Sequence, residues 1–272
     1  MSREIVFAKM HGLGNDFVII DAELLPTKYD LEKLALIVAD RHLGLGCDQF
    51  IVYQKYHDYY EMQVYNQDGS RALACGNAVR CLAKLLYINS NKENIDIKIA
   101  GRKITAQVLA SNQIMVNMGA VSFNEQWMPT SEEIWHVAER YMFDPKEMIC
   151  ADIGNPHLVI FSHLNSQDQE VVGKMLQEHE LFPDGINVDF AYIKDNKIYL
   201  SVWERGAGFT LACGSGACVS FAAAVKLGFM DAAAEVVFKY GSLSMSRNET
   251  DIIMTGSATL VAIGKYYYEY TS

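Results

Sequence analysis

An internal repeat constrains the fold of this chain more than any other feature of its sequence. The segment Leu73-Ala74-Cys75-Gly76 recurs as Leu211-Ala212-Cys213-Gly214, with an offset of 138 residues between the two cysteines. Further matches follow in the same order at offsets of 138 to 140 residues: Gly14-Asn15 with Gly154-Asn155, Asp30-Leu31-Glu32 with Asp168-Gln169-Glu170, Gln49 with Asn187, Val64-Tyr65-Asn66 with Val202-Trp203-Glu204, and Gly101 with Gly241. A single duplication with so long a period predicts two related halves and excludes an array of short repeats.

The repeat also predicts where the chain divides. We expect an N-terminal half over residues 1–119 that carries Cys75, and a C-terminal half over residues 120–272 that carries Cys213. The end of the chain is expected to pack back onto the first half. No flexible Gly/Ser linker lies near the boundary, so the halves are predicted to pack directly on each other.

Both halves have the sequence pattern of α+β domains. Alternation of apolar and polar residues predicts strands at 61–65, 95–99, 104–109 and 114–118, and again at 158–161, 198–203, 236–238, 243–246 and 260–263. Two helices are expected in each half, at 30–40 and 77–87 and at 168–179 and 217–227, with Asp30 as an N-cap. We therefore predict two domains related by a pseudo-two-fold axis. Each is a curved mixed or antiparallel sheet around a central helix, with the active site in the cleft between them.

Composition excludes several classes of function. The net charge is −10 and lysine and arginine form no cluster, which argues against a nucleic-acid partner. No apolar run approaches the roughly 18 residues of a membrane span, and the N-terminus has no signal-peptide pattern, so a cytoplasmic location is expected. None of the six cysteines has Cys-x-x-Cys spacing, so neither a structural metal site nor a disulfide framework is predicted.

The duplicated cysteines stand at the predicted starts of two helices. Free N–H groups and the positive end of the helix dipole favour a thiolate there, so the thiol pKa is expected to fall. If the two starts face each other, one thiol can remove a proton from a carbon while the other delivers a proton to the opposite face. The N–H groups would hold an adjacent carboxylate and stabilise the developing charge. This pattern predicts a two-base racemase or epimerase that needs no cofactor.

An ordinary structural explanation competes at each cysteine, because most cytosolic cysteines are inert core residues. The duplication separates Cys75 and Cys213 from that background. The remaining four cysteines are interpreted as core residues: Cys47, Cys81, Cys150 and Cys218.

Six segments, in order, resemble the diaminopimelate epimerase family along essentially the whole chain. They are Met10-His11-Gly12-Leu13-Gly14-Asn15-Asp16-Phe17, Gly46-Cys47-Asp48-Gln49, Asn66-Gln67-Asp68-Gly69-Ser70, Ala74-Cys75-Gly76-Asn77, Gly154-Asn155-Pro156-His157, and Glu204-Arg205-Gly206-Ala207-Gly208 running on to Ala212-Cys213-Gly214-Ser215-Gly216-Ala217. The resemblance implies a homodimeric isomerase that interconverts LL- and meso-diaminopimelate for lysine and peptidoglycan synthesis, without pyridoxal phosphate or metal.

The resemblance also implies roles for individual residues. Cys75 and Cys213 would be the two bases. N–H groups toward the reacting carboxylate would come from Gly76, Asn77, Gly214 and Ser215. The far end of the substrate would be held by Asn15, Asn66, Asn155, Asn187 and Arg205. Glu204 would accept from an ammonium or lie near Cys213, and His157 and Gln49 would support the site.

A turn or a helix cap is the alternative interpretation for the asparagines. Asn15 and Asn155 follow glycines, and Asn187 is expected in a turn. Arg205 ends an otherwise apolar strand, so its side chain is expected to be buried and to need an anion. Four residues depart from the pattern of the resembled family: Ala78, Ala100, Phe209 and Leu211.

Three other functions compete with this interpretation. A proline or hydroxyproline racemase would leave Arg205 and the asparagines without a purpose, and an isomerase of phenazine synthesis would not need two cysteines. A non-enzymatic binding protein for a dicarboxylic amino acid would explain the anchors but not the paired thiols. Entry of solvent deuterium at the α-carbon separates an epimerase from a binding protein.

Overall fold

The computed structural model describes residues 2–25, 30–72 and 76–269. The chain forms two compact units, Met1–Val116 together with Gly256–Ser272, and Asn117–Thr255. In the described residues, no helix is long and apolar enough to cross a membrane.

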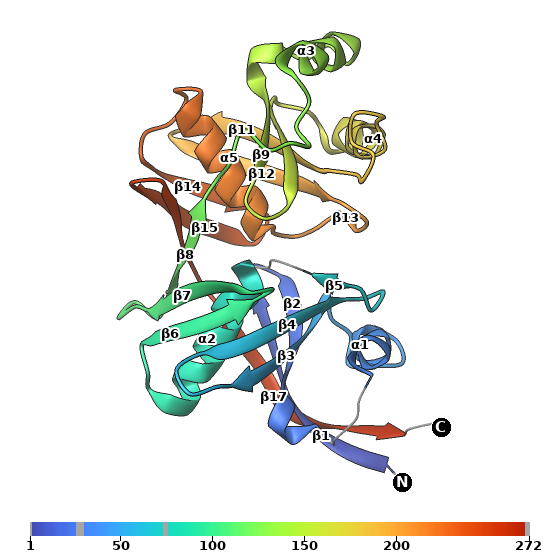
Figure 1. The fold of residues 1–272 in the computed structure, drawn as a ribbon, viewed down its shortest axis with the longest axis vertical. Coiled ribbons are helices and arrows are strands. Elements are labelled where there is room, and N and C mark those ends of the chain that lie inside the picture. Colours follow the sequence, from blue (N-terminus) through green and yellow to red (C-terminus); the bar gives the residue numbers. More distant parts are fainter. Residues whose placement is uncertain (1, 26–29, 73–75, 270–272) are drawn as a thin grey trace. The chain divides into compact units, whose positions relative to one another are not determined.

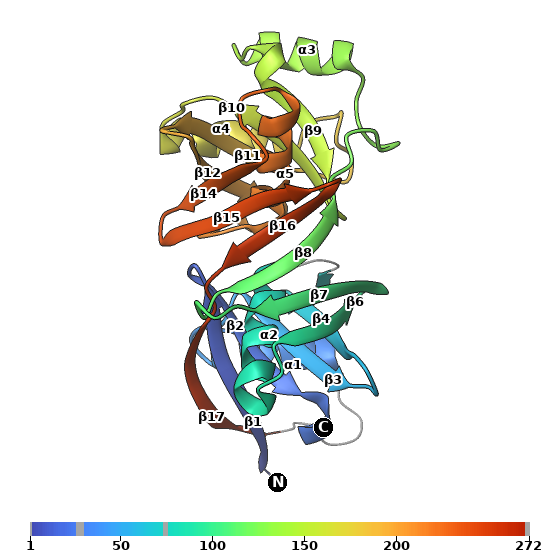
Figure 2. The same ribbon diagram turned by 90° about the vertical axis from the view of Figure 1, so that its left-hand side faces the viewer.

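The first unit contains two helices and most of the strands that precede residue 117. Its elements are β1 (Ser2–Gly12), β2 (Asn15–Asp21), a 3-10 turn (Ala22–Leu24), α1 (Leu31–Ala39), β3 (Gln49–Lys55), β4 (Tyr60–Asn66), β5 (Arg71–Ala72), α2 (Gly76–Ser90), β6 (Asn94–Ile99), β7 (Arg102–Val108) and β17 (Thr259–Glu269). The strand β17 pairs antiparallel with β1 along most of its length, which returns the end of the chain to this unit (Figure 2).

The second unit repeats this order and adds a helix. Its elements are α3 (Ser131–Arg140), a 3-10 turn (Pro145–Glu147), β9 (Met148–Asp152), β10 (Pro156–Phe161), α4 (Ser166–Gln177), β11 (Asn187–Lys194), β12 (Lys197–Glu204), β13 (Gly208–Phe209), α5 (Gly214–Lys226), β14 (Ala233–Phe238) and β15 (Gly241–Asn248). Two further strands contain the points where the chain passes between units, β8 (Ile114–Ala120) and β16 (Asp251–Gly256).

Strand pairing confirms the duplication. In the first unit β2 pairs parallel with β3, β3 antiparallel with β4, β4 parallel with β6, and β6 antiparallel with β7. In the second unit β10, β11, β12, β14 and β15 are joined in the same parallel and antiparallel sequence. The predicted mixed-sheet α+β class is therefore correct.

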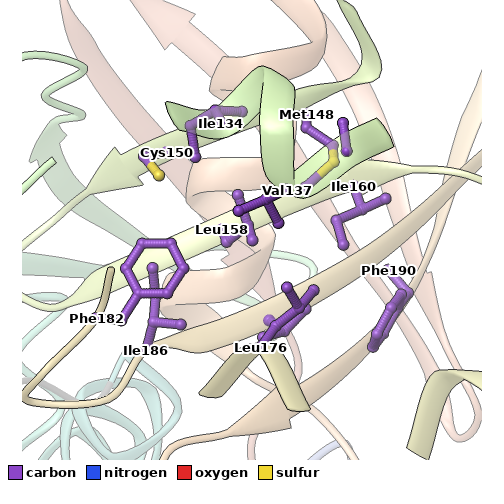
Figure 3. Close-up of a cluster of buried hydrophobic side chains, with 12 residues drawn as sticks. Ile134, Val137, Met148, Cys150, Leu158, Ile160, Leu176, Phe182, Ile186 and Phe190 are labelled. Atoms are coloured by element: carbon purple, nitrogen blue, oxygen red, sulfur yellow. The ribbon is translucent and has the colours of Figure 1, made fainter. Parts of the chain in front are cut away.

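Each sheet has a central helix against one face and shorter helices against the other (Figure 1). The helix α2 contacts β1, β2, β6, β7 and β17, and α5 contacts β9 through β12, β14 and β15. On the opposite face of the second sheet, Ile134 and Val137 of α3 and Leu176 of α4 pack against strand residues such as Leu158 (Figure 3). Strands that are buried on both faces keep their alternate side chains on fixed sides, which determines which residues face α5.

The helix predictions were correct in number only for the first unit. Asp30 is the N-cap of α1 as expected, and Gly228 has the positive φ of a residue that follows a helix end. The helix α4 begins at Ser166 with Asn165 as its N-cap, which is earlier than the predicted start. The helix α3 was not predicted, although Thr130 and Glu133 form a capping box at its start.

Candidate active site

Two glycines in left-handed conformation place equivalent asparagines at the starts of equivalent strands. Gly14 has φ 93° and Gly154 has φ 107°, a region that side chains with a Cβ rarely occupy. Asn15 is the first residue of β2, and Asn155 directly precedes β10. Asn15 therefore lies at the start of a strand, and Asn155 lies in the bend that leads into the equivalent strand.

In the second unit, three polar side chains occur on the face of β10 and β11 that packs on α5. His157 pairs with Asn187 across these parallel strands, and Asp189 lies two residues further along β11. The neighbouring residues Leu158 and Val188 pack on the opposite side with α3 and α4. Strand alternation thus directs His157, Asn187 and Asp189 to the side of α5.

Cys213 is the N-cap of α5, as the repeat predicted. Its Sγ accepts a hydrogen bond from the backbone N–H of Gly216 at 3.3 Å, and it lies 3.3 Å from Ser215 Oγ. Gly214 is the first residue of the helix and is buried. The cysteine therefore has the helix-start geometry that the two-base chemistry requires.

The expected fall in thiol pKa is wrong for Cys213. Burial raises its pKa well above the ordinary value, and the charges of Glu204 and Asp189 raise it further. The hydrogen bonds from Ser215 and the Gly216 N–H favour the thiolate, but they do not outweigh desolvation and two nearby carboxylates. A raised pKa favours the protonated thiol, which is the state of a proton donor.

A short series of polar contacts runs from Cys213 into the core. Ser215 Oγ lies 3.1 Å from His157 Nε2, and His157 Nδ1 lies 2.6 Å from Asp189 Oδ2. Asn155 Nδ2 donates to the same Ser215 hydroxyl at 3.2 Å. His157 and Asp189 are both fully buried, so this pair is held away from solvent.

Glu204 is the last residue of β12 and belongs to the same cluster. Burial of its carboxyl raises its pKa, while hydrogen bonds with Thr210 and Cys213 act in the opposite direction. Thr210 Oγ1 donates to Glu204 Oε1. Glu204 and the catalytic candidate Cys213 therefore influence each other's pKa.

Asn187 and Arg205 are linked through the backbone. The Asn187 side chain donates to the Pro156 carbonyl at 2.8 Å and accepts from the Arg205 N–H at 2.9 Å, and it is buried as the first residue of β11. The expectation that Arg205 is buried is wrong, because its side chain is exposed after β12 ends. Its Nη1 donates to the Asp184 carbonyl at 3.0 Å.

In the first unit, Asn15 and Asn77 are joined directly. Asn77 lies in the first turn of α2 and donates to Asn15 Oδ1 at 3.1 Å, and both side chains are buried. Asn15 Nδ2 donates to Asp48 Oδ2 at 2.9 Å. Arg41 bridges Asp48 at 2.7 Å and Asp16 at 2.8 Å, so an ionic network orients the asparagine.

Two further candidates of the first unit pair across β3 and β4. Gln49 Nε2 donates to Asn66 Oδ1 at 2.9 Å, and Asn66 Nδ2 donates to Ser70 Oγ at 3.1 Å. Gly76 is the buried first residue of α2. Cys75 lies outside the described residues.

Several residues of this candidate site were not predicted from the sequence. Asp189, Asp48 and Arg41 carry the contacts that orient His157 and Asn15, yet only Asp48 stood in a recognised motif. Arg80 of α2 is fully buried, and its Nε donates to the Ser257 carbonyl at 3.3 Å. Within the described residues, no group of three or more His, Cys, Asp or Glu side chains is arranged to hold a metal ion.

Comparison with known proteins identifies the family. A family model for diaminopimelate epimerase matches residues 7–124 and 149–261. The diaminopimelate epimerases of Rickettsia akari (strain Hartford) and Rickettsia prowazekii (strain Madrid E) are 61% and 59% identical to the chain over 269 residues, covering 99% of this chain and 100% of theirs. The chain belongs to the diaminopimelate epimerase family.

Solved structures with low sequence identity to this chain share its fold. A hydroxyproline epimerase from Agrobacterium vitis gives a TM-score of 0.71 at 11% identity, covering 97% of this chain and 91% of that chain. A phenazine biosynthesis protein of the PhzF family from Bacillus anthracis gives 0.72 at 14% identity, covering 97% and 99%. At these identities the likeness concerns the fold alone. Membership of the diaminopimelate epimerase family separates this chain from those two functional alternatives.

Three of the four departures from the family pattern occupy ordinary positions, whereas Ala100 has a left-handed backbone conformation. Ala78 is buried within α2, and Ala100, with φ 47°, lies in the turn between β6 and β7. Phe209 packs edge-on against Trp203 with ring centroids 5.2 Å apart. Leu211 is partly exposed ahead of α5.

Proposed function

We propose that this chain interconverts LL-2,6-diaminopimelate and meso-2,6-diaminopimelate, using a thiolate and thiol pair and no cofactor. The observation that carries the proposal is the family match over both halves, joined to a cysteine N-cap with a polar cluster around it. The reaction supplies precursors for lysine and peptidoglycan synthesis.

Cys75 and Cys213 are the proposed bases. One removes the α-proton as a thiolate while the other delivers a proton to the opposite face as a thiol, and the reverse reaction exchanges the two states. The raised pKa of Cys213, caused first by burial, supports its starting as the proton donor. Cys75 then starts as the acceptor.

The carboxylate beside the reacting carbon is proposed to bind the N–H groups at the two helix starts. Gly76 and Asn77 begin α2, and Gly214 and Ser215 begin α5. Charge that develops as the proton leaves is stabilised by such pre-oriented donors, which lowers the barrier by several kcal/mol.

The rest of the substrate carries ammonium groups and a second carboxylate. Gln49 Oε1 and Asn155 Oδ1 are buried acceptors without a hydrogen-bond partner among the described residues, and an ammonium group would satisfy them. The other proposed anchors are Asn15, Asn66, Asn187 and Glu204. Arg205 is proposed to bind the far carboxylate, because a guanidinium can hold it with two parallel hydrogen bonds.

We also propose a cytoplasmic homodimer. Exposed apolar side chains on β17, Val261 and Ile263 among them, offer a surface that a second copy would cover. The acidic net charge of −10 supports the absence of a nucleic-acid partner.

Exchange of the α-proton tests the function. The purified protein in D₂O, given LL-diaminopimelate, should lose the α-proton signal and produce the meso isomer without added cofactor. L-Proline and 4-hydroxyproline, given in parallel, should show neither change. Binding of diaminopimelate without exchange would indicate a binding protein, and exchange of proline would indicate a racemase; either result would contradict the proposal.

A further inference from the structure

The Ser215 hydroxyl has more neighbours than it has protons, and this determines the direction of its hydrogen bonds. It lies within 3.3 Å of Asn155 Nδ2, His157 Nε2 and Cys213 Sγ. A hydroxyl can donate once and accept twice, and an amide nitrogen can only donate. One of the other two neighbours must therefore accept the hydroxyl proton.

The position of Asp189 indicates which neighbour accepts the proton of the Ser215 hydroxyl. Its carboxylate oxygen lies 2.6 Å from His157 Nδ1, so the imidazole carries a proton on that nitrogen. The Nε2 atom of a neutral imidazole is then an acceptor and receives the Ser215 proton. The hydroxyl oxygen is left to accept from Asn155 and from the Cys213 thiol. This arrangement satisfies all three contacts of the Ser215 hydroxyl.

The packing of α5 against β11 leaves space for the side chain of Asp189. Its other oxygen, Oδ1, lies 2.6 Å from where a Cβ of Gly216 would stand, so only glycine leaves room for the carboxylate beside the first turn of α5. A fully buried carboxylate is costly unless it is paired, and His157 Nδ1 lies 2.6 Å from its Oδ2. The structure thus holds a charged group at a position where an apolar residue would cost less.

We propose that Asp189 is a positioning residue that fixes the tautomer of His157 and, through the Ser215 hydroxyl, directs the proton of the Cys213 thiol. This role rests on the proposed function of Cys213 as an acid and base. Once Cys213 has given its proton to the substrate carbon, the Ser215 hydroxyl can rotate and donate to the thiolate. In the described part of the chain Asp189 makes no hydrogen bond to the sulfur, and it acts through His157.

Other charged groups around the thiol do not provide this orientation. Glu204 of β12 accepts a hydrogen bond from Thr210 and raises the pKa of Cys213, but in the described part of the chain it makes no hydrogen bond to His157. His157 comes from β10, Asp189 from β11, and the helix α5 contributes the backbone N–H of Gly216. Loss of the Asp189 carboxylate would therefore alter the tautomer without removing any group that contacts the sulfur.

The Asp189→Asn variant tests the proposal. The amide can donate to His157 Nδ1, which moves the imidazole proton to Nε2 and turns the Ser215 hydroxyl away. We expect kcat for diaminopimelate to fall about 10- to 100-fold with little change in KM, by analogy with the loss of other orienting partners. Long-range ¹H–¹⁵N spectra of histidine-labelled protein should show the Nδ1–H tautomer of His157 in the wild type and the Nε2–H tautomer in the variant. The His157→Gln variant assigns its signals among the seven histidines.

A double-mutant cycle separates positioning from general support of the fold. In a Ser215→Ala background the link is absent, so Asp189→Asn should cause little further loss of kcat. Equal losses in both backgrounds would overturn the proposal, as would a wild-type spectrum with the proton on Nε2. That spectrum decides the matter even if the variant does not fold. Asp144→Asn, at the N-cap of the 3-10 turn 145–147, is the matched control and should change neither readout. Failure of the wild type to turn over diaminopimelate would contradict the proposed function and leave the tautomer measurement intact.

Discussion

The two units place different chemistry at the same positions of the same scaffold. Phe17 pairs with Gln49 across β2 and β3, just as His157 pairs with Asn187 across β10 and β11. Two residues further along β3 stands Ile51, where β11 carries Asp189. All four side chains at the exchanged positions are buried. An apolar pair in one unit therefore corresponds to a buried ionisable pair in the other.

The central helices differ in a complementary way. Arg80 is buried in α2, whereas the equivalent residue of α5 is Cys218. Gly216, which leaves room for Asp189, corresponds to Ala78. The duplication thus preserves backbone geometry while the electrostatic environments of the two helix starts diverge. A two-base reaction needs one protonated and one deprotonated group, so a difference between the two helix starts is compatible with the proposed function.

The largest expected effect follows from the proposed requirement for both thiols, although the two helix starts differ in sequence. Cys75→Ala and Cys213→Ala should each lower kcat about 10³-fold or more, because each direction of turnover needs a base and an acid. Cys218→Ala, in the same helix as Cys213, should affect stability and not turnover. Isomer formation measured by coupled assay or chiral chromatography checks this. Near-normal turnover in either of the first two variants would show that one thiol suffices.

The second prediction replaces the ionisable pair of the second unit with apolar side chains, as at the equivalent positions of the first unit. His157→Phe leaves the Asp189 carboxylate buried without its partner and should lower the free energy of unfolding by about 3–5 kcal/mol. Adding Asp189→Leu, which removes the charge and keeps the branching, should recover most of that loss. Turnover should stay low in both variants. Urea unfolding measures the first effect, and equal stability of the single and double variants would contradict the pairing.

Short-range patterns were sufficient for much of the fold. The cap at Asp30, the helix start after Cys213 and the strand alternation depend on residues that are close in sequence, and the repeat compares two such local patterns. The α+β class and the starts of α1 and α5 could therefore be predicted. The helix α3 was missed although the capping-box pair Thr130 and Glu133 was present in the sequence. Its apolar face is short and contacts a layer that exists only in the second unit.

The electrostatics of the site could not be predicted in the same way. The pKa of Cys213 depends on burial and on carboxylates from β11 and β12, whereas the sequence offered only the helix start. His157 and Asp189 are 32 residues apart, and an aspartate in an apolar strand has no sequence signal for its partner. Arg205 followed an apolar strand, but the chain turns to the surface there. Each of these properties arises from contacts between separate elements.

The third prediction compares the carboxylates of the two units. Burial alone would raise the pKa of Asp16, but hydrogen bonds from Arg41 and Lys9 outweigh it and lower the pKa to about 2. A depressed pKa stabilises the fold above the ordinary value of 3.8, and the contribution is lost as the pH falls toward about 2. The pKa of Glu204 shifts in the opposite direction, because burial raises it. Its contribution to the stability of the fold is therefore present at low pH and disappears as the pH rises through the folded-state pKa.

Asp16→Asn should therefore lower the free energy of unfolding by about 2 kcal/mol at neutral pH. It should also flatten the acid side of the stability profile. Urea titrations between pH 7 and 2 measure both effects. The exposed Asp58→Asn variant serves as a control. An unchanged profile in Asp16→Asn would show that the Arg41 network does not stabilise the first unit.

The smallest expected effect concerns Arg205 and its counterpart in the first unit, Gln67. The Gln67 side chain donates to the Cys47 carbonyl at 3.0 Å, much as Arg205 Nη1 donates to the Asp184 carbonyl at 3.0 Å. Arg205→Gln can therefore keep a loop contact while it removes the cation. If Arg205 binds the far carboxylate, this variant should raise KM about tenfold, or about 1.4 kcal/mol, since the exposed site is screened by solvent. The free energy of unfolding should change little, whereas Arg205→Ala should lose both the contact and the binding. Steady-state kinetics beside urea unfolding distinguishes the two roles: a stable Arg205→Gln variant with an unchanged KM would make Arg205 a loop anchor, and the far carboxylate would then bind elsewhere.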